Sequence, residues 1–226
     1  MTDRVIIVTG AFGALGRAVA AAARAEGARV VGVDHAEDPP EDFDADGVWG
    51  GVDLTDAEQA VEAMNSISQA FGRIDALVNV AGGFVWETVE GNDNASWERM
   101  QALNLMTALN ASRAALPYLV ESGAGRIVNI GARGALSAAM GMGAYAASKA
   151  GVHRLTEALA EEYKGRVTIN AVLPSIIDTP TNRKDMPDAD PSKWVTAQEV
   201  AAVILFLASE AASGVTSALI PVAGRV

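Results

Sequence analysis

The chain has 226 residues, of which half are apolar and none is cysteine, and its formal net charge is −11. This composition excludes intrinsic disorder, disulfide bonds and a thiolate metal centre, and the acidity argues against nucleic acid or an anionic membrane as a partner. No apolar run approaches the roughly 20 residues that span a bilayer, and no signal peptide is recognised before the first apolar segment. We therefore expect a cytoplasmic protein without a metal site.

A β-branched segment, residues 4–9, predicts a buried first strand, and a glycine-rich turn follows it from Gly10 to Gly16. Helix-like sequence then continues to residue 26. A strand, a glycine turn and a helix form a cradle for a pyrophosphate, because glycines admit the phosphates and the helix N-terminus offers free N–H groups. A tight turn without a ligand would also favour glycines. The position of this turn at the first strand of an alternating chain favours the cradle.

The second expected strand, residues 29–33, ends at Asp34. A carboxylate about 20 residues after the glycine turn can accept hydrogen bonds from the adenosine ribose and would repel a 2′-phosphate. Phe12, Gly13 and His35 provide no arginine for such a phosphate. The sequence therefore predicts NAD as cofactor, with NADH preferred over NADPH. The alternative is that Asp34 only caps a loop.

Strands and helices alternate along the rest of the chain. Apolar runs predict further strands at residues 47–52, 74–80, 126–130, 166–173 and 219–222, and helices follow Asp56 and cover residues 96–121, 144–163 and 196–209. Residues 84–94 and 174–195 are expected to be loops over a site. We therefore expect an α/β fold: one Rossmann-type domain over residues 1–226, with a doubly wound parallel sheet of about seven strands and helices on both faces.

Tyr145 and Lys149 are four residues apart, so they share one face of the expected helix. A nearby ammonium favours phenolate and would lower the pKa of the phenol toward neutrality, which would let Tyr145 donate or accept a proton. The alternative is an ordinary helix start with one aromatic residue and one surface lysine.

The ordered motifs resemble the short-chain dehydrogenase/reductase family over nearly the full length of the chain. The matching residues are Thr9-Gly10, Gly16, Asp34, Asp53-Leu54, Asn79-Val-Ala-Gly82, Asn104, Tyr145-x-x-x-Lys149, Asn170-Ala-Val-Leu-Pro174 and Thr179. The resemblance implies that Tyr145, Lys149 and Asn104 are catalytic, and that Ala132, Phe84, Trp86 and Tyr145 face the substrate. It implies a cofactor site formed by Gly10, Phe12, Gly13, Ala14, Leu15, Asp34, Asp53, Leu54, Asn79, Ala81, Gly82, Lys149, Pro174, Ile177 and Thr179.

Ala132 departs from the family pattern, because the family has there the serine that polarises a substrate carbonyl. Ser137 would replace that hydroxyl only if the loop were rearranged. The dihydropteridine reductase branch also lacks the serine, and the chain resembles it in Gly131-Ala-Arg133, in Asp178-Thr-Pro180 and in the run from Asn182 to Pro187. Asn104 disagrees with that branch, which typically lacks it.

The resemblance implies an NADH-dependent oxidoreductase in which Tyr145 is the proton donor, with a quinonoid dihydropteridine as the leading substrate. The alternatives are a carbonyl or alcohol oxidoreductase of the 3-oxoacyl or ketone reductase type without the usual serine, and a dinucleotide-binding protein without turnover. Small residues on the helices that carry Asn104 and Tyr145 allow close packing, and by family analogy these helices form a two-fold interface. We therefore expect a homodimer or homotetramer.

Overall fold

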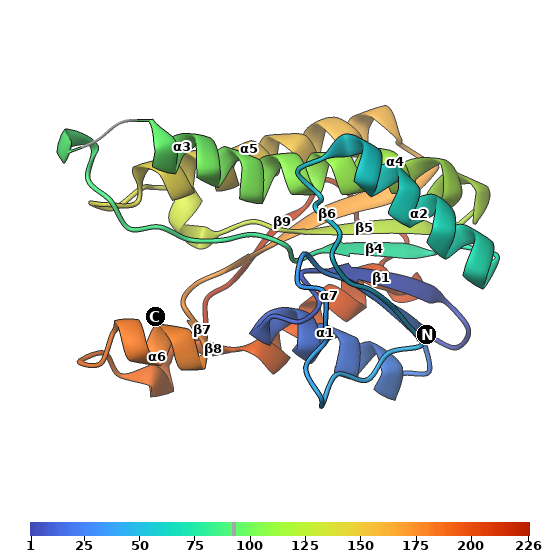
Figure 1. Ribbon diagram of the computed structural model, residues 1–226, viewed down its shortest axis with the longest axis horizontal. Coiled ribbons are helices and arrows are strands. Elements are labelled where there is room, and N and C mark those ends of the chain that lie inside the picture. Colours follow the sequence, from blue (N-terminus) through green and yellow to red (C-terminus); the bar gives the residue numbers. More distant parts are fainter. Residues whose placement is uncertain (92–93) are drawn as a thin grey trace.

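The computed structural model describes every residue except 92 and 93. Its main sheet has seven parallel strands in the order β3-β2-β1-β4-β5-β6-β9, with helices on both faces (Figure 1). The strands are β1 Val5–Thr9, β2 Arg29–Val33, β3 Gly47–Trp49, β4 Ala76–Asn79, β5 Gly125–Ile130, β6 Val167–Pro174 and β9 Leu219–Val222. This arrangement confirms the expected doubly wound Rossmann-type fold.

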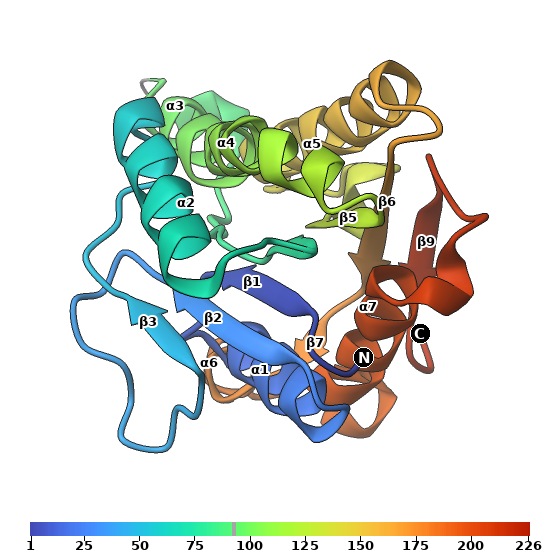
Figure 2. The same cartoon turned by 90° about the vertical axis from the view of Figure 1, so that its right-hand side faces the viewer.

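The helices cover the two faces of the sheet unequally. One face carries α1 Ala14–Ala25 and α7 Ala197–Ala208, and the other carries α2 Ala57–Phe71, α4 Thr107–Glu121 and α5 Gly143–Glu162 (Figure 2). Side chains alternate along β1 accordingly: Ile6 and Val8 pack with α1 and α7, whereas Val5 and Ile7 pack with α2 and α4. All four are fully buried. A strand covered on both faces therefore reads as a continuous apolar run.

The order of the strands reverses between β1 and β4, which are neighbours at the centre of the sheet. Thr9, the last residue of β1, pairs with Asn79, the last residue of β4. The Thr9 hydroxyl accepts hydrogen bonds from the N–H groups of Val80 and Ala81, both at 3.1 Å. The carboxyl ends of the two strands are thus joined where ligands bind in folds of this kind.

Three expected elements differ in detail. The helix expected at residues 96–121 is interrupted, because α3 Ala95–Met100 is followed by a π-helical turn, Gln101–Met106, before α4 begins. The expected loop 174–195 contains β7 Ile177–Asp178, α6 Pro180–Asp185 and a 3-10 turn at Pro191–Lys193, and β7 pairs with β8 Val195–Thr196. The expected loop 84–94 includes a 3-10 turn at Val89–Gly91, and its residues 92 and 93 lie outside the described part.

The start of α7 follows its sequence signal. The Thr196 hydroxyl accepts from the Glu199 N–H at 3.1 Å, and the Thr196 N–H donates to the Glu199 carboxylate at 2.8 Å, so the two residues form a capping box. Within the described residues, none of the helices combines the length and the apolar character needed to cross a membrane.

Candidate active site

The glycine-rich turn is packed too tightly for side chains at two positions. Gly10 has a φ of +59°, and a Cβ there would lie 2.8 Å from the backbone N of Ala81. A Cβ on Gly16 would lie 2.2 Å from the Gly10 carbonyl oxygen. Gly13 is different, since it is exposed and a Cβ there would meet only that same oxygen, at 3.4 Å. The turn therefore needs glycine at Gly10 and Gly16 for its own folding and leaves its outer side at Gly13 open.

The first turn of α1 is suited to an anion. The helix begins at Ala14 with no side-chain cap and has no acidic residue in its first turn. Its leading N–H groups and the positive end of its dipole therefore remain available for a phosphate. Ala14 is exposed at this point, whereas Leu15 is buried in the core. Phe12 holds the turn against the following loop by an edge-to-face contact with Phe43, with centroids 5.2 Å apart.

Asp34 lies directly after β2 and reaches back to the glycine turn. Its carboxylate accepts hydrogen bonds from the backbone N–H of Phe12 at 2.9 Å and from that of Ala36 at 3.1 Å. The side chain therefore does stabilise local backbone, as the capping alternative supposed. A carboxylate can accept about four hydrogen bonds, so Asp34 also retains capacity for ribose hydroxyls.

The segment at Asp53 and Leu54 is held by a residue that the sequence did not single out. Asp53 accepts hydrogen bonds from the N–H and the hydroxyl of Thr55, and Leu54 is buried. From α4, the buried Asn110 amide donates to the carbonyl oxygens of Leu54 and Thr55, both at 3.0 Å. An amide between the apolar residues Leu109 and Ala111 was the available signal for Asn110.

Asn79, the last residue of β4, has a buried side chain that bonds inside the protein. Its amide donates to Ser112 at 3.0 Å and to Asn129 at 2.8 Å, and Asn129 in turn donates to Thr156 at 2.9 Å. All four residues are buried, and they join β4 and β5 to α4 and α5. The N–H donors of the Asn79 amide are therefore used inside the protein, and the place of Asn79 in the cofactor site stays a prediction. Among the neighbours named with it, Ala81 is half-buried and Gly82 is exposed.

Asn104 connects the loop after β4 to the start of α5. Its side-chain oxygen accepts from the Gly83 N–H at 2.9 Å, and its amide donates to the Gly83 carbonyl at 3.1 Å and to Ser148 at 3.0 Å. Ser148 donates to the Tyr145 carbonyl at 2.8 Å. A Cβ on Gly82 would lie 2.5 Å from the Asn104 side-chain oxygen and 3.4 Å from Lys149 Nζ. Asn104, Gly82 and Lys149 are therefore brought together, with Ser148 as a link that sequence reasoning missed.

Tyr145 and Lys149 share one face of α5 as expected, but burial dominates their titration. The Lys149 ammonium is buried and donates to the Ile130 carbonyl oxygen at 2.8 Å, and burial lowers its pKa to about 8. Burial also raises the pKa of Tyr145 to about 12. The expected lowering toward neutrality is thus wrong for this structure, because removing a phenolate from water outweighs the attraction of the lysine.

Ala132 is buried, and its N–H donates to Nε2 of His153 at 3.2 Å. A Cβ on Gly131 would lie only 2.5 Å from the same Nε2. The imidazole of α5 therefore fixes the backbone at the position where the family has its serine. Ser137, the other hydroxyl considered, is exposed after the 3-10 turn Arg133–Ala135.

His153 should make the protein sensitive to acid. Burial, with smaller contributions from the charges of Arg154 and Lys149, lowers the pKa of His153 from 6.5 to about 4. His153 therefore takes up a proton below about pH 6.5 in the unfolded chain but only below about pH 4 in the folded chain. The free energy of unfolding falls as the pH falls through that window. We expect the free energy of unfolding, measured in urea, to decrease between pH 7 and pH 5 by about 1–2 kcal/mol more in the wild type than in the His153→Gln variant. Equal losses would contradict the assignment.

Two aromatic side chains in the loop after β4 are exposed, and one of them contacts Tyr145. The Phe84 ring lies edge-on to the Tyr145 ring with centroids 5.0 Å apart, although Phe84 is 56% exposed. Trp86, 57% exposed, lies against Gly141, where an added Cβ would come within 2.2 Å of the indole. The Glu87 N–H donates to the Gly141 carbonyl at 2.8 Å, which ties the two loops together. Of the two expected substrate-facing aromatics, Phe84 therefore lies beside the tyrosine and Trp86 lies against Gly141, and both remain accessible.

The residues expected at the nicotinamide end follow β6. Pro174 is buried at the end of that strand, and Ile177 begins β7. The Thr179 hydroxyl accepts from the Asn182 N–H at 3.1 Å and so caps α6. Figure 1 shows α6 and the loop before α3 at the same end of the molecule, on opposite sides of the sheet. This end holds the residues that follow the carboxyl ends of the strands.

Residues 4–190 match the sequence model of one protein family, which is described as "short chain dehydrogenase". The chain belongs to this family. It is 33% identical to a 3-oxoacyl-[acyl-carrier-protein] reductase of Thermotoga maritima, over 99% of this chain and 98% of that one. The ligand-free aldohexose dehydrogenase of Thermoplasma acidophilum superposes with a TM-score of 0.91 at 31% identity, over 99% of this chain and 94% of the other.

A second solved structure contains a bound cofactor. The carveol dehydrogenase of Mycobacterium avium, in complex with NAD, has a TM-score of 0.88 at 27% identity, over 99% of this chain and 97% of that chain. This short-chain dehydrogenase is accordingly an oxidoreductase. The finer resemblance to the dihydropteridine reductase branch gains no support from these relatives, which are a reductase and two dehydrogenases by name.

Proposed function

We propose that this short-chain dehydrogenase is an NADH-dependent reductase in which Tyr145 donates the proton. The residues fit NAD: the open turn at Gly13 and the uncapped start of α1 suit the pyrophosphate, and Asp34 suits the adenosine ribose. Ala81, Gly82, Lys149, Ile177 and Thr179 would hold the remainder. The carveol dehydrogenase structure with NAD supports this cofactor. When bound, NADH supplies the hydride.

Burial sets the resting protonation state of the tyrosine. A phenol with a pKa of about 12 is protonated at neutral pH, so Tyr145 holds the proton that reduction requires. Lys149, with a pKa of about 8, carries a positive charge over most of the physiological range. Its ammonium lies one helical turn from Tyr145 and would stabilise the phenolate left after proton donation.

The leading substrate is a quinonoid dihydropteridine. The observation that carries this proposal is Ala132, a buried methyl group whose N–H already bonds to His153. A conjugated ring that takes up hydride and is protonated on nitrogen develops no alkoxide, so it has less need of a hydroxyl at this position. The accessible rings of Phe84 and Trp86 offer apolar surface for a planar substrate.

A carbonyl or alcohol oxidoreductase is the second candidate, and the names of the relatives favour it. Such an enzyme would have to stabilise a developing alkoxide without a side-chain donor at Ala132. Dinucleotide binding without turnover is a third possibility, and the retained cluster of Asn104, Tyr145 and Lys149 argues against it.

Restoring the family hydroxyl separates the first two candidates. We expect NADH oxidation with quinonoid dihydropterin, and we expect Ala132→Ser to change its kcat/KM by no more than about tenfold. The same variant should raise a weak ketone reduction, because an added donor stabilises an alkoxide. Ala138→Ser, on the exposed segment beyond the site, is the matched control. The second candidate would be established instead if the wild type did not oxidise NADH with dihydropterin and Ala132→Ser raised ketone reduction roughly a hundredfold.

Two properties remain proposals. The homodimer or homotetramer rests on the small residues of α4 and α5, and several of these, including Ala111 and Ala146, are buried within the single chain. The cytoplasmic location rests on the absence of cysteine and on the use of an NADH pool.

A further inference from the structure

A cavity of about 530 Å³ opens at the amino ends of the strands, at the end of the sheet opposite to the candidate active site. Its walls come from the amino ends of β5 and β6, the 3-10 turn Glu210–Ala212 and the segment that leads to β9. The candidate cofactor residues follow the carboxyl ends of the strands, so the two sites are separated by the length of the sheet. A cavity of this volume is in the range that holds small molecules.

The cavity has a buried cation in its wall. Arg126 is only 5% exposed, and its guanidinium donates to the carbonyl oxygens of Ser209, Ala124 and Gly125 at 3.0–3.2 Å. All three acceptors are neutral. Arg126 takes part in no ion pair within the described part of the chain. A buried charge without a counter-ion is unfavourable, so this guanidinium would gain from an anion beside it.

A second guanidinium adds to the positive potential. Arg4 is 8% exposed and donates to the same Ala124 carbonyl oxygen at 2.9 Å. Its Nε is buried without a partner among the described residues. Burial lowers the pKa of Arg126 and the charge of Arg4 lowers it further, whereas the charge of Glu210 raises it by less. Two like charges that share one neutral acceptor favour a negative ligand nearby.

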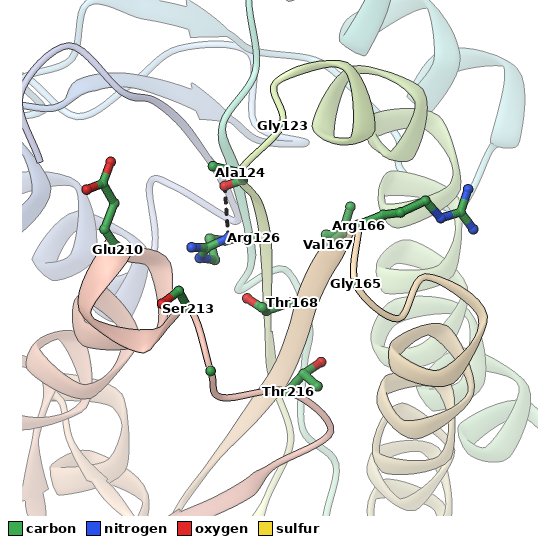
Figure 3. A pocket seen from close by; sticks show the side chains of 11 residues that line it. Gly123, Ala124, Arg126, Gly165, Arg166, Val167, Thr168, Glu210, Ser213 and Thr216 are labelled. Atoms are coloured by element: carbon green, nitrogen blue, oxygen red, sulfur yellow. Dashed lines mark hydrogen bonds between the residues drawn. The ribbon is translucent and has the colours of Figure 1, made fainter.

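The opposite wall of the cavity contains a threonine, Thr168, whose hydroxyl makes no hydrogen bond to the described residues. Thr168 Oγ1 is buried and has no hydrogen-bond partner among the described residues. Figure 3 shows the Thr168 side chain and the Arg126 guanidinium facing the space between β6 and the 3-10 turn, whereas Arg166 extends away from it. A buried polar atom without a partner is rare in folded proteins. A polar ligand atom bonded to this hydroxyl would give it the partner that it lacks.

We propose that this cavity binds the anionic oxygen group, phosphate or carboxylate, of a small molecule. The oxyanion would accept hydrogen bonds from the Arg126 guanidinium and the Thr168 hydroxyl, and guanidinium is the side-chain group best matched to such an anion. Glu210 is the only carboxylate among the lining residues and is exposed at the rim. Its charge opposes the anion, which limits affinity and provides a test. The proposal is independent of the cofactor and the reaction.

The experiment measures binding of inorganic phosphate and of citrate to the full chain by isothermal titration calorimetry. The two probes distinguish a phosphate site from a carboxylate site. Thr168→Val keeps the shape of the side chain and should weaken binding about fivefold, because one hydrogen bond is lost. Glu210→Gln should tighten binding about threefold, because a nearby like charge is removed. Glu62→Gln, on the exposed face of α2, removes the same charge far from the cavity and should have no effect.

Arg126→Gln should abolish binding, and the threonine and glutamate variants decide the matter if that protein fails to fold. Phosphate could also bind at the start of α1, and binding there would be unchanged in the Thr168 and Glu210 variants. The proposal would be overturned if both variants bound the probes with unchanged affinity. It would also be overturned if neither probe gave a heat of binding at concentrations up to about 50 mM.

Discussion

Replacing Tyr145 by phenylalanine should lower kcat by about 10²-fold, the low end of the 10²–10⁴-fold typical of general acid catalysis. The hydroxyl is the only group lost, because phenylalanine keeps the ring and its edge-on contact with Phe84. The low end is expected because water can also protonate a ring nitrogen. Steady-state assays with saturating NADH measure the change, and a ketone substrate, which has no such alternative donor, should suffer the larger loss.

The Tyr145 variant needs two accompanying measurements. NADH binding, followed by nicotinamide fluorescence, should be unchanged, since the phenol is not proposed to hold the cofactor. Lys149→Ala is the contrasting variant: it removes both the expected ribose contact and the ammonium one turn from the phenol, so KM for NADH should rise while kcat falls. If Tyr145→Phe retained activity within about threefold of the wild type, the proton would have to come from another group.

Asp34 should determine the choice of cofactor. We expect kcat/KM to be about 10²-fold higher with NADH than with NADPH, because a 2′-phosphate would meet the carboxylate at the end of β2. Asp34→Ala should narrow that ratio by about tenfold or more. The variant also removes the hydrogen bonds to the N–H groups of Phe12 and Ala36, so efficiency with NADH should fall as well.

Asp38→Ala is the matched control for this change. It removes the same charge from the exposed loop that follows β2 and should leave the ratio of the two cofactors unaltered. A wild type that uses NADH and NADPH equally would show that Asp34 serves only the local backbone, which was the alternative expected from the sequence.

Much of the fold follows from patterns that are local in the chain. The apolar runs at β1 and β2, the capping box at Thr196 and the glycines at Gly10 and Gly16 each report a backbone requirement that neighbouring residues impose. The prediction of a loop at residues 174–195 was less accurate. β7 and β8 pair across 18 residues of chain (177 to 195), and neither is long enough to show the alternation of apolar and polar residues that marks a strand. The π-helical turn at 101–106 likewise has no distinct composition.

The sequence by itself determined the class of fold and the position of the glycine-rich turn. It also pointed to Tyr145 and Lys149 as a pair on one helix face and to the missing hydroxyl at Ala132. The tertiary structure alone decided what surrounds these groups. Burial, which no spacing reveals, set the pKa of Tyr145 to about 12 and that of Lys149 to about 8. The partners Ser148, His153 and Asn110 lie 21 to 56 residues from the atoms they bind, as the bonds Asn104–Ser148, Ala132–His153 and Asn110–Leu54 show. Such contacts depend on how whole elements pack, and a linear pattern carries no record of them.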